Sequence, residues 1–100
     1  MKHFLITYRL TSSSEEQRRR EIVAFISALE NAAALRGRIA YRCLKAREGP
    51  DYYHLATAAD DEAVAALQSR EFFTRYTEQT ELAADGKVDV IPLELITETS

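Results

Sequence analysis

The sequence predicts an α+β fold in which helices cover one face of a small antiparallel sheet. Four segments have the period-two alternation of β-strands: 3–10, 38–47, 52–58 and 87–97. Two helical stretches lie between them, and a tight turn at 48–51 joins two of the strands directly. The order is therefore strand, helix, strand, strand, helix, strand.

Composition is that of one ordinary globular domain spanning residues 1–100, with 46% hydrophobic and 29% charged residues. The net charge of -3 does not indicate a nucleic-acid-binding protein. The run Arg18-Arg19-Arg20 stands beside Glu15, Glu16 and Glu21 at helical pairing distances. We interpret the run as a solvated helix face rather than a phosphate-binding patch.

No feature indicates a membrane, a metal or a cofactor. The single cysteine, Cys43, excludes an internal disulfide, and no apolar run is long enough to span a bilayer. No signal-peptide pattern opens the chain, so we expect a cytoplasmic protein. The adjacent acids Asp60, Asp61 and Glu62 match no calcium loop and are interpreted as helix-start residues.

The first strand alternates Phe4, Ile6, Tyr8 and Leu10 with a second set in which Leu5 and Thr7 are not strongly polar, so both of its faces are expected to be covered. Ser12-Ser13-Ser14, with an acid or glutamine three residues after each serine, predicts a capped helix start. A helical stripe follows, which consists of Ile22, Phe25, Ile26, Leu29 and Ala33. Gly37 is expected to end this helix.

The hairpin and the second helical region follow from similar local signals. Glu48-Gly49-Pro50-Asp51 has the composition of a turn between the strands at 38–47 and 52–58. Asp60 or Asp61 is expected to cap a helix of small apolar residues, and Ser69 is expected to cap a new helical turn rich in aromatic residues.

The last strand, 87–97, follows the turn Asp85-Gly86. Its apolar residues change face near Ile91-Pro92, which predicts either a bulge or an edge position, since proline cannot donate to a ladder. This order of elements predicts a ferredoxin-like, four-stranded antiparallel sheet. Because the face away from the helices is also apolar, we expect two sheets to pack together as a homodimeric α+β barrel.

The chain resembles the antibiotic biosynthesis monooxygenase-like family of dimeric α+β barrels. The resemblance covers nearly the whole chain and rests on four short segments: Gly37-Arg38-Ile39-Ala40-Tyr41-Arg42, Asp51-Tyr52-Tyr53-His54-Leu55, Asp61-Glu62-Ala63, and Ser69 with Phe72. It implies a pocket between the helices and the sheet of each subunit. Members of the family bind polycyclic aromatics, quinols or haem there, and some oxygenate them without a conventional cofactor.

Several positions depart from the family pattern. Many members carry an acid and a tryptophan on the third strand and a histidine on the helix after it. This chain has Leu55, Thr57 and Ala66 there and contains no tryptophan. Without that helical histidine as an iron ligand, the resemblance does not extend to haem degradation.

Two residues are the candidates for catalysis. Oxygenation without a metal or flavin needs an electron-rich substrate anion, formed by a base and held by a cation. His54 is the candidate base, and the alternative is a hydrogen-bonded structural histidine. Arg42 is the candidate cation, and the alternatives are an exposed arginine head or a pair with an acid such as Glu94.

The aromatic residues are candidates for lining the substrate pocket, and the alternative is an ordinary core or dimer interface. The candidate pocket residues are Tyr8, Tyr41, Tyr53, Phe72 and Tyr76. Cys43 is interpreted as a small buried hydrophobe. The resemblance thus implies a small-molecule protein, with cofactor-independent monooxygenation of a small aromatic or quinol as the candidate activity. A non-catalytic binding barrel or a structural dimer is the alternative.

Overall fold

A computed structural model describes residues 1–100. Its seven elements, in chain order, are β1 (Lys2–Arg9), α1 (Glu15–Asn31), β2 (Ile39–Lys45), β3 (Asp51–Ala58), α2 (Asp61–Gln68), α3 (Glu71–Ala83) and β4 (Val88–Leu93). The predicted order of strands and helices is confirmed, with the second helical region divided into α2 and α3.

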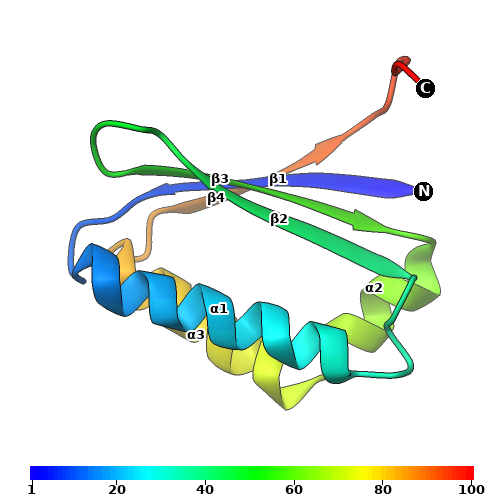
Figure 1. Cartoon of the computed structure of the whole chain (residues 1–100), viewed down its shortest axis with the longest axis horizontal. Helices are drawn as coiled ribbons and strands as arrows, with labels where there is room; N and C mark the ends of the chain where they lie inside the picture. Colours follow the sequence, from blue (N-terminus) through cyan, green and yellow to red (C-terminus); the bar gives the residue numbers. More distant parts are fainter.

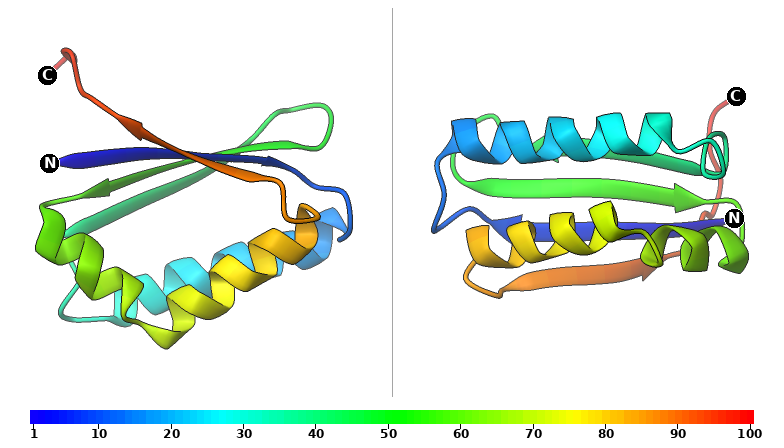
Figure 2. Two further views of the ribbon diagram at one scale, coloured as in Figure 1. Left: turned by 180° about the vertical axis from the view of Figure 1, so that it is seen from behind. Right: turned by 90° about the horizontal axis from the view of Figure 1, so that it is seen from below.

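The four strands form one antiparallel sheet in the order β2-β3-β1-β4 (Figure 1). All three helices lie on the same face of this sheet. The two longer ones, α1 and α3, run side by side in opposite directions, and α2 lies at the end of the layer (Figure 2). This is the predicted ferredoxin-like arrangement. None of the three helices combines the length and apolar character that crossing a membrane requires.

Helix α1 begins as the serine triplet predicts but ends earlier than expected. Ser14 is the N-cap, and its side chain accepts a hydrogen bond of 3.1 Å from the backbone N–H of Gln17. The helix ends at Asn31, and turns occupy residues 33–38. In these turns Leu35 reaches the core while Ala33 is exposed. The assignment of Ala33 to the buried stripe was therefore wrong.

The junction of α2 and α3 differs from the prediction in one respect. Asp60 caps α2 as expected, and its side-chain Oδ1 accepts a hydrogen bond of 2.8 Å from the backbone N–H of Ala63. Ser69, however, ends α2, and its hydroxyl donates backwards to the carbonyl of Ala66 at 2.8 Å. Because only two residues separate the helices, Ser69 is used at the end of one, and α3 starts after Arg70 without a side-chain cap.

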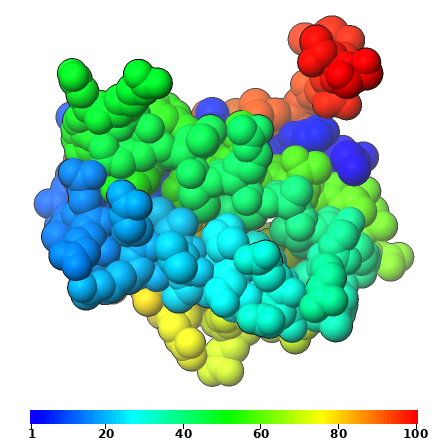
Figure 3. Space-filling model, viewed as in Figure 1, coloured from blue at the N-terminus to red at the C-terminus, as the bar shows by residue number.

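Strand β4 is shorter than the predicted 87–97 and has no bulge. Its register with β1 is continuous from Val88 to Leu93, and Pro92 lies opposite Phe4 on the outer edge of the sheet. The predicted edge position is thus confirmed, and the apparent change of face arises because both faces of β4 are apolar. Beyond Leu93 the chain leaves the body of the molecule (Figure 3), and Leu95 and Ile96 are exposed.

The strand register divides the sheet into two faces. Ile6, Cys43, His54 and Val90 lie in one row across all four strands, on the face that the helices cover. The neighbouring row points to the opposite, open face and consists of Leu5, Arg42, Leu55 and Ile91. Each strand therefore contributes alternate side chains to two separate surfaces.

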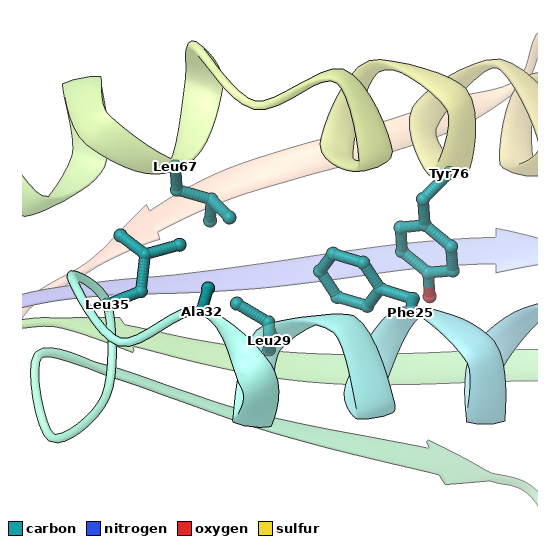
Figure 4. Packing of buried hydrophobic residues seen from close by; sticks show 6 residues of the cluster. All are labelled: Phe25, Leu29, Ala32, Leu35, Leu67 and Tyr76. Atoms are coloured by element: carbon teal, nitrogen blue, oxygen red, sulfur yellow. The ribbon is translucent and has the colours of Figure 1, made fainter.

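The core lies between α1, α3 and the sheet. Phe25 and Tyr76 lie against each other (Figure 4). Their ring centroids are 3.9 Å apart and their planes are 4° from parallel, so the rings are stacked. Leu29, Leu35 and Leu67 continue this cluster towards α2. The stacked pair thus joins the two long helices directly.

We expect Phe25→Ala to lower the free energy of unfolding by about 3–5 kcal/mol, since it removes a buried ring that four other aromatic rings contact. Urea unfolding followed by circular dichroism measures this change. Val23→Ala on the same helix is the matched control, because Val23 is 61% exposed and its truncation should change stability by less than about 0.5 kcal/mol. Equal effects of the two substitutions would contradict this description of the core.

Candidate functional site

A hollow with an almost entirely apolar wall lies between α2, α3 and the sheet, on the helix-covered face. Its volume is about 220 Å³. The lining residues are Phe4, Ile6, Ile39, Tyr41, Ala56, Thr57, Ala58, Val64, Leu67, Gln68, Phe73 and Val90. We call this space the apolar cavity. Nearly all of its wall is hydrocarbon or aromatic ring, which suits an apolar or aromatic molecule.

A second hollow adjoins it under α3. It measures about 120 Å³ and shares Ile6, Tyr41 and Val90 with the apolar cavity. Its other lining residues are His54, Tyr76, Thr77, Thr80, Glu81 and Val88. We call this space the polar cavity. The two together give the site an apolar end and an end where hydroxyl groups and the carboxylate of Glu81 interrupt an otherwise apolar wall, with the buried imidazole of His54 behind them.

Behind the polar cavity, His54 lies between two tyrosines. Its Nε2 is 3.1 Å from the hydroxyl of Tyr8, and its Nδ1 is 3.2 Å from the hydroxyl of Tyr76. Both ring nitrogens are thus hydrogen-bonded within the protein, and the His54 side chain is fully buried. Strands β1 and β3 place Tyr8 and His54 on the helix-facing side of the sheet, and Tyr76 reaches from α3 towards α1 (Figure 4).

The chain of hydrogen bonds continues to Arg18 of α1. Its Nε donates to the Tyr8 hydroxyl at 2.8 Å, one terminal nitrogen donates to Thr80 Oγ1 at 2.6 Å, and the other pairs with Glu21 at 3.1 Å. The guanidinium also lies against the rings of Tyr8 and Tyr76, 5.1 and 4.9 Å from their centroids. Arg18 is 0% exposed, and no buried side-chain nitrogen or oxygen lacks a partner. We call Arg18, Tyr8, His54, Tyr76 and Thr80 the buried polar cluster.

Burial keeps the histidine and the tyrosines of this region neutral near pH 7. Burial, aided by the charge of Arg18, lowers the pKa of His54 to about 4. Burial raises the pKa of Tyr8 to about 12 and raises those of Tyr41 and Tyr76 further. Neutral His54 therefore carries one ring proton, and all three phenols keep theirs.

Tyr41 differs from the other two phenols because its hydroxyl makes no hydrogen bond with the protein, although it is not sealed from solvent. It lines both cavities. Its hydroxyl can therefore bond to an oxygen of a molecule that occupies them.

The structure brings together some of the predicted site residues and separates others. His54, Tyr8, Tyr41 and Tyr76 converge on the helix-covered face. Their shared alternation places them on the same side of neighbouring strands, and α3 brings Tyr76 above them.

Arg42 and Tyr53 lie on the open face, so the predicted convergence of Arg42 with His54 is wrong. The physical reason is the strand period of two: Cys43, and not Arg42, lies opposite His54. Phe72 packs against Phe25 in the core, and its neighbour Phe73 lines the apolar cavity instead. His3 lies on the open face, where its Nδ1 is 3.3 Å from Thr57 Oγ1.

Sequence reasoning missed Arg18, Thr80 and Glu81. The run Arg18-Arg19-Arg20 was interpreted as a solvated face, which is wrong for Arg18 and correct for its two neighbours, both exposed. A signal was present, because Arg18 stands four and seven residues before Ile22 and Phe25 and so belongs to the buried stripe. Across the whole chain, no group of three His, Cys, Asp or Glu side chains is placed to hold a metal ion.

No protein-family model matches the sequence, and no curated protein matches it either. Solved structures do match. SnoaB, a cofactor-independent oxygenase from Streptomyces nogalater, superposes with a TM-score of 0.78 at 9% identity, covering 97% of this chain and 94% of its own. A protein from Caulobacter crescentus described as a putative antibiotic biosynthesis monooxygenase superposes with a TM-score of 0.79 at 10% identity. The match covers 96% of this chain and 90% of that chain.

The fold is that of antibiotic biosynthesis monooxygenase-like proteins. A dimeric ferredoxin-like protein of unknown function from Jannaschia shares it too, with a TM-score of 0.67 at 23% identity over 95% of this chain and 100% of that one. These identities are low, so the likeness concerns the fold, and chemistry has to be argued from the site itself.

The lowered pKa of His54 predicts that the free energy of unfolding decreases as the pH is lowered below 6.5. In the unfolded chain this imidazole has its ordinary pKa of 6.5, whereas in the folded protein the value is about 4. The unfolded chain therefore binds more protons between these values. The contribution of His54 to stability is present in full above about pH 6.5. The free energy of unfolding should fall by about 2 kcal/mol from pH 7 to pH 4.5 as this contribution is lost.

Urea unfolding at a series of pH values measures this loss. His54→Gln should remove most of the slope in that range, whereas His3→Gln should retain it, because His3 lies outside the buried polar cluster. A wild-type stability that stays constant from pH 7 to 4.5 would show that His54 is not held neutral.

Proposed function

We propose that the protein binds a small hydroxylated aromatic molecule in the joined cavities and oxygenates it without a cofactor. The observation that supports this most is the join itself: an apolar cavity leads to a polar one where Tyr41, Tyr76 and His54 are grouped. An aromatic ring would occupy the apolar cavity, and its oxygen would lie at the polar end. The fold shared with SnoaB, a cofactor-independent oxygenase, is in keeping with this proposal.

The chemistry needs an oxygen anion on the ring, because an aryl oxide is electron-rich enough to react with O₂. For a phenol with a free para carbon, the net change is phenol plus O₂ to quinone plus water. One oxygen atom becomes the new carbonyl, the other leaves as water with two hydrogens, and the ring supplies the four electrons that O₂ accepts. The site's contribution is to orient the ring, exclude water and stabilise the anion.

The size of the site restricts the substrate. A dry apolar cavity of roughly 150 Å³ is enough to hold benzene, and the apolar cavity here measures about 220 Å³. A one- or two-ring substrate fits such a space, whereas a polycyclic one does not fit without displacement of its walls. The proposed substrate is therefore a single-ring or naphthalene-sized phenol or quinol.

The polar residues take distinct roles in this proposal. Tyr41 binds the substrate oxygen through its free hydroxyl. His54 was predicted as the base, but both of its nitrogens are occupied by tyrosines, so its proposed role is to hold Tyr76 in place. Glu81 lies at the rim of the polar cavity and is the only carboxylate among its lining residues.

A second candidate function is binding without catalysis. Every buried side-chain nitrogen and oxygen of the buried polar cluster has a hydrogen-bond partner, which is also what a stable structural network requires. In that case the same aromatic molecules would bind, but O₂ would not be consumed.

We also propose that the protein is a homodimer through the open face of the sheet. That face exposes Leu44, Tyr53, Ile91 and Leu93, and the polar cavity lies on the opposite side. A two-fold packing of these faces would cover their apolar side chains. The dimeric state of the Jannaschia protein is in keeping with this proposal. Arg42 would then lie in the interface, and a cytoplasmic location stays a prediction from the sequence.

The activity is tested with 1-naphthol, whose para carbon is free, by an oxygen electrode and chromatography of the product. We expect O₂ consumption and 1,4-naphthoquinone formation in equal amounts. Val64→Trp should abolish both, because its side chain would fill the apolar cavity, whereas Val23→Trp on the exposed side of α1 should not. Binding without O₂ consumption would favour the second candidate, and absence of binding would contradict both.

The dimer is tested by sedimentation at several protein concentrations. Ile91→Glu should convert a dimer to a monomer, since it places a charge in the middle of the apolar open face while its side chain is already 42% exposed in one subunit. Leu82→Glu is the matched control, because Leu82 is a 75% exposed residue of α3, on the helix side. A monomeric wild type would contradict the proposal.

A further inference from the structure

We propose that Arg18, acting through Tyr8, fixes His54 as the Nδ1–H tautomer and thereby makes the polar cavity a hydrogen-bond donor that selects a phenolate over a neutral phenol. This inference rests on the proposed function for the identity of the ligand. The tautomer, however, is a property of the protein without ligand and can be tested separately.

The first step is the direction of the bond between Arg18 and Tyr8. A guanidinium has only donors, so Nε–H must donate to the Tyr8 oxygen, and the distance of 2.8 Å is short. With its oxygen accepting from Arg18, Tyr8 has its own hydrogen left to donate. The other hydrogen-bonding atom near that hydroxyl is Nε2 of His54, at 3.1 Å. Tyr8 therefore donates and Nε2 accepts.

The second step follows from the charge of His54. A neutral imidazole carries one proton on one of its two nitrogens. Burial and the charge of Arg18 keep His54 neutral, with a pKa of about 4. Since Nε2 accepts, the proton resides on Nδ1, which then donates to the hydroxyl of Tyr76 at 3.2 Å.

The opposite tautomer is disfavoured by the same contacts. If Nε2 carried the proton, the Tyr8 oxygen would accept from both His54 and Arg18. The Tyr8 hydrogen would then have no acceptor in a side chain that is almost completely buried. An unmade hydrogen bond at a buried hydroxyl costs about 1–3 kcal/mol. The Nδ1–H form avoids this cost because the hydrogen of Tyr76 then faces the polar cavity and the thiol of Cys43, whereas the hydrogen of Tyr8 has no such alternative.

The series of hydrogen bonds from Arg18 ends at Tyr76, which lines the polar cavity. Because Tyr76 accepts from His54, its own hydrogen points away from the imidazole, and Tyr76 lines the polar cavity beside Tyr41. The thiol of Cys43 lies near this hydroxyl. Burial raises the pKa of that thiol, and a neutral thiol is a weak acceptor that an oxygen anion would displace. Tyr76 and Tyr41 are thus two donors available to one ligand oxygen.

The charges around the site agree with a bound anion. Arg18 supplies a positive charge behind Tyr76, partly offset by its pair with Glu21. The cavity contains no free base except the carboxylate of Glu81, which is exposed at the rim. We infer that the substrate proton leaves to water or to Glu81, and that the buried polar cluster stabilises the anion that remains.

The tautomer is tested by long-range ¹H–¹⁵N correlation spectra of the ligand-free protein. The chain has two histidines, so His3→Gln assigns the signals of His54. We expect a protonated Nδ1 and an unprotonated Nε2 in the wild type. Tyr8→Phe removes the hydrogen donated to Nε2 and should shift His54 to the Nε2–H form, and Arg18→Met should do the same. If Arg18→Met does not fold, Tyr8→Phe tests the same step. An Nε2–H wild type overturns the proposal.

The selectivity is tested with 4-nitrophenol, whose anion absorbs at a longer wavelength than its neutral form, and with 4-nitroanisole, which cannot ionise. Titration of bound 4-nitrophenol should show a pKa about one unit lower than in water, which corresponds to about tenfold tighter binding of the anion. Tyr76→Phe should abolish this shift, and Tyr8→Phe should reduce it. The affinity for 4-nitroanisole should be unchanged in both variants.

The outcomes separate this inference from the proposed function. An Nδ1–H tautomer together with preferred binding of the anion supports both. An Nδ1–H tautomer with equal binding of anion and ether overturns the selectivity but leaves an aromatic-binding cavity. If neither probe binds at any pH, the proposed function fails and the ligand half of this inference fails with it, whatever the tautomer. A lowered pKa that persists in Tyr76→Phe assigns the effect to other groups and overturns the proposal.

Discussion

The buried guanidinium of Arg18 constrains the whole helix-covered face. Removing such a group from water costs several kcal/mol unless its donors find acceptors. Here the acceptors come from three elements: Tyr8 on β1, Glu21 on α1 itself and Thr80 on α3. These bonds form only when α1 and α3 take one position over the sheet. The same position leaves the two cavities beside the cluster, so the constraint on stability also shapes the candidate site.

The alternation of side chains along each strand gives the sheet two faces, one towards the cavities and one away from them. Residues such as Ile6, His54 and Val90 face the helices and the cavities, and their immediate neighbours Leu5, Leu55 and Ile91 face away. Chemistry is therefore proposed on one face and dimerisation on the other. A substitution on the open face should alter assembly without direct contact with the site.

Much of the fold and part of the site could be predicted from sequence, because those features depend on neighbours along the chain. The cap at Ser14, the cap at Asp60 and the edge position of Pro92 are local properties of the backbone. The grouping of Tyr8, Tyr41 and His54 needed the register of the strands as well, because alternation assigns a residue to a face only once the strands are aligned. The position of Ser69 at the end of α2 could not be predicted, since its hydroxyl can bond to the end of α2 or cap the start of α3.

The sequence by itself determined the order of elements, the two apolar faces of the sheet and the aromatic character of the core, because all three are encoded in periodicity. Only the tertiary structure decided that Arg18 is buried while Arg19 and Arg20 are exposed, and that Arg42 lies away from His54. Both decisions depend on partners distant in sequence. The burial of Arg18 is stabilised by Tyr8 and Thr80, and the position of Arg42 is set by the register of β2 against β3. Side-chain partnership across elements is a property of the folded chain, and no local pattern specifies it.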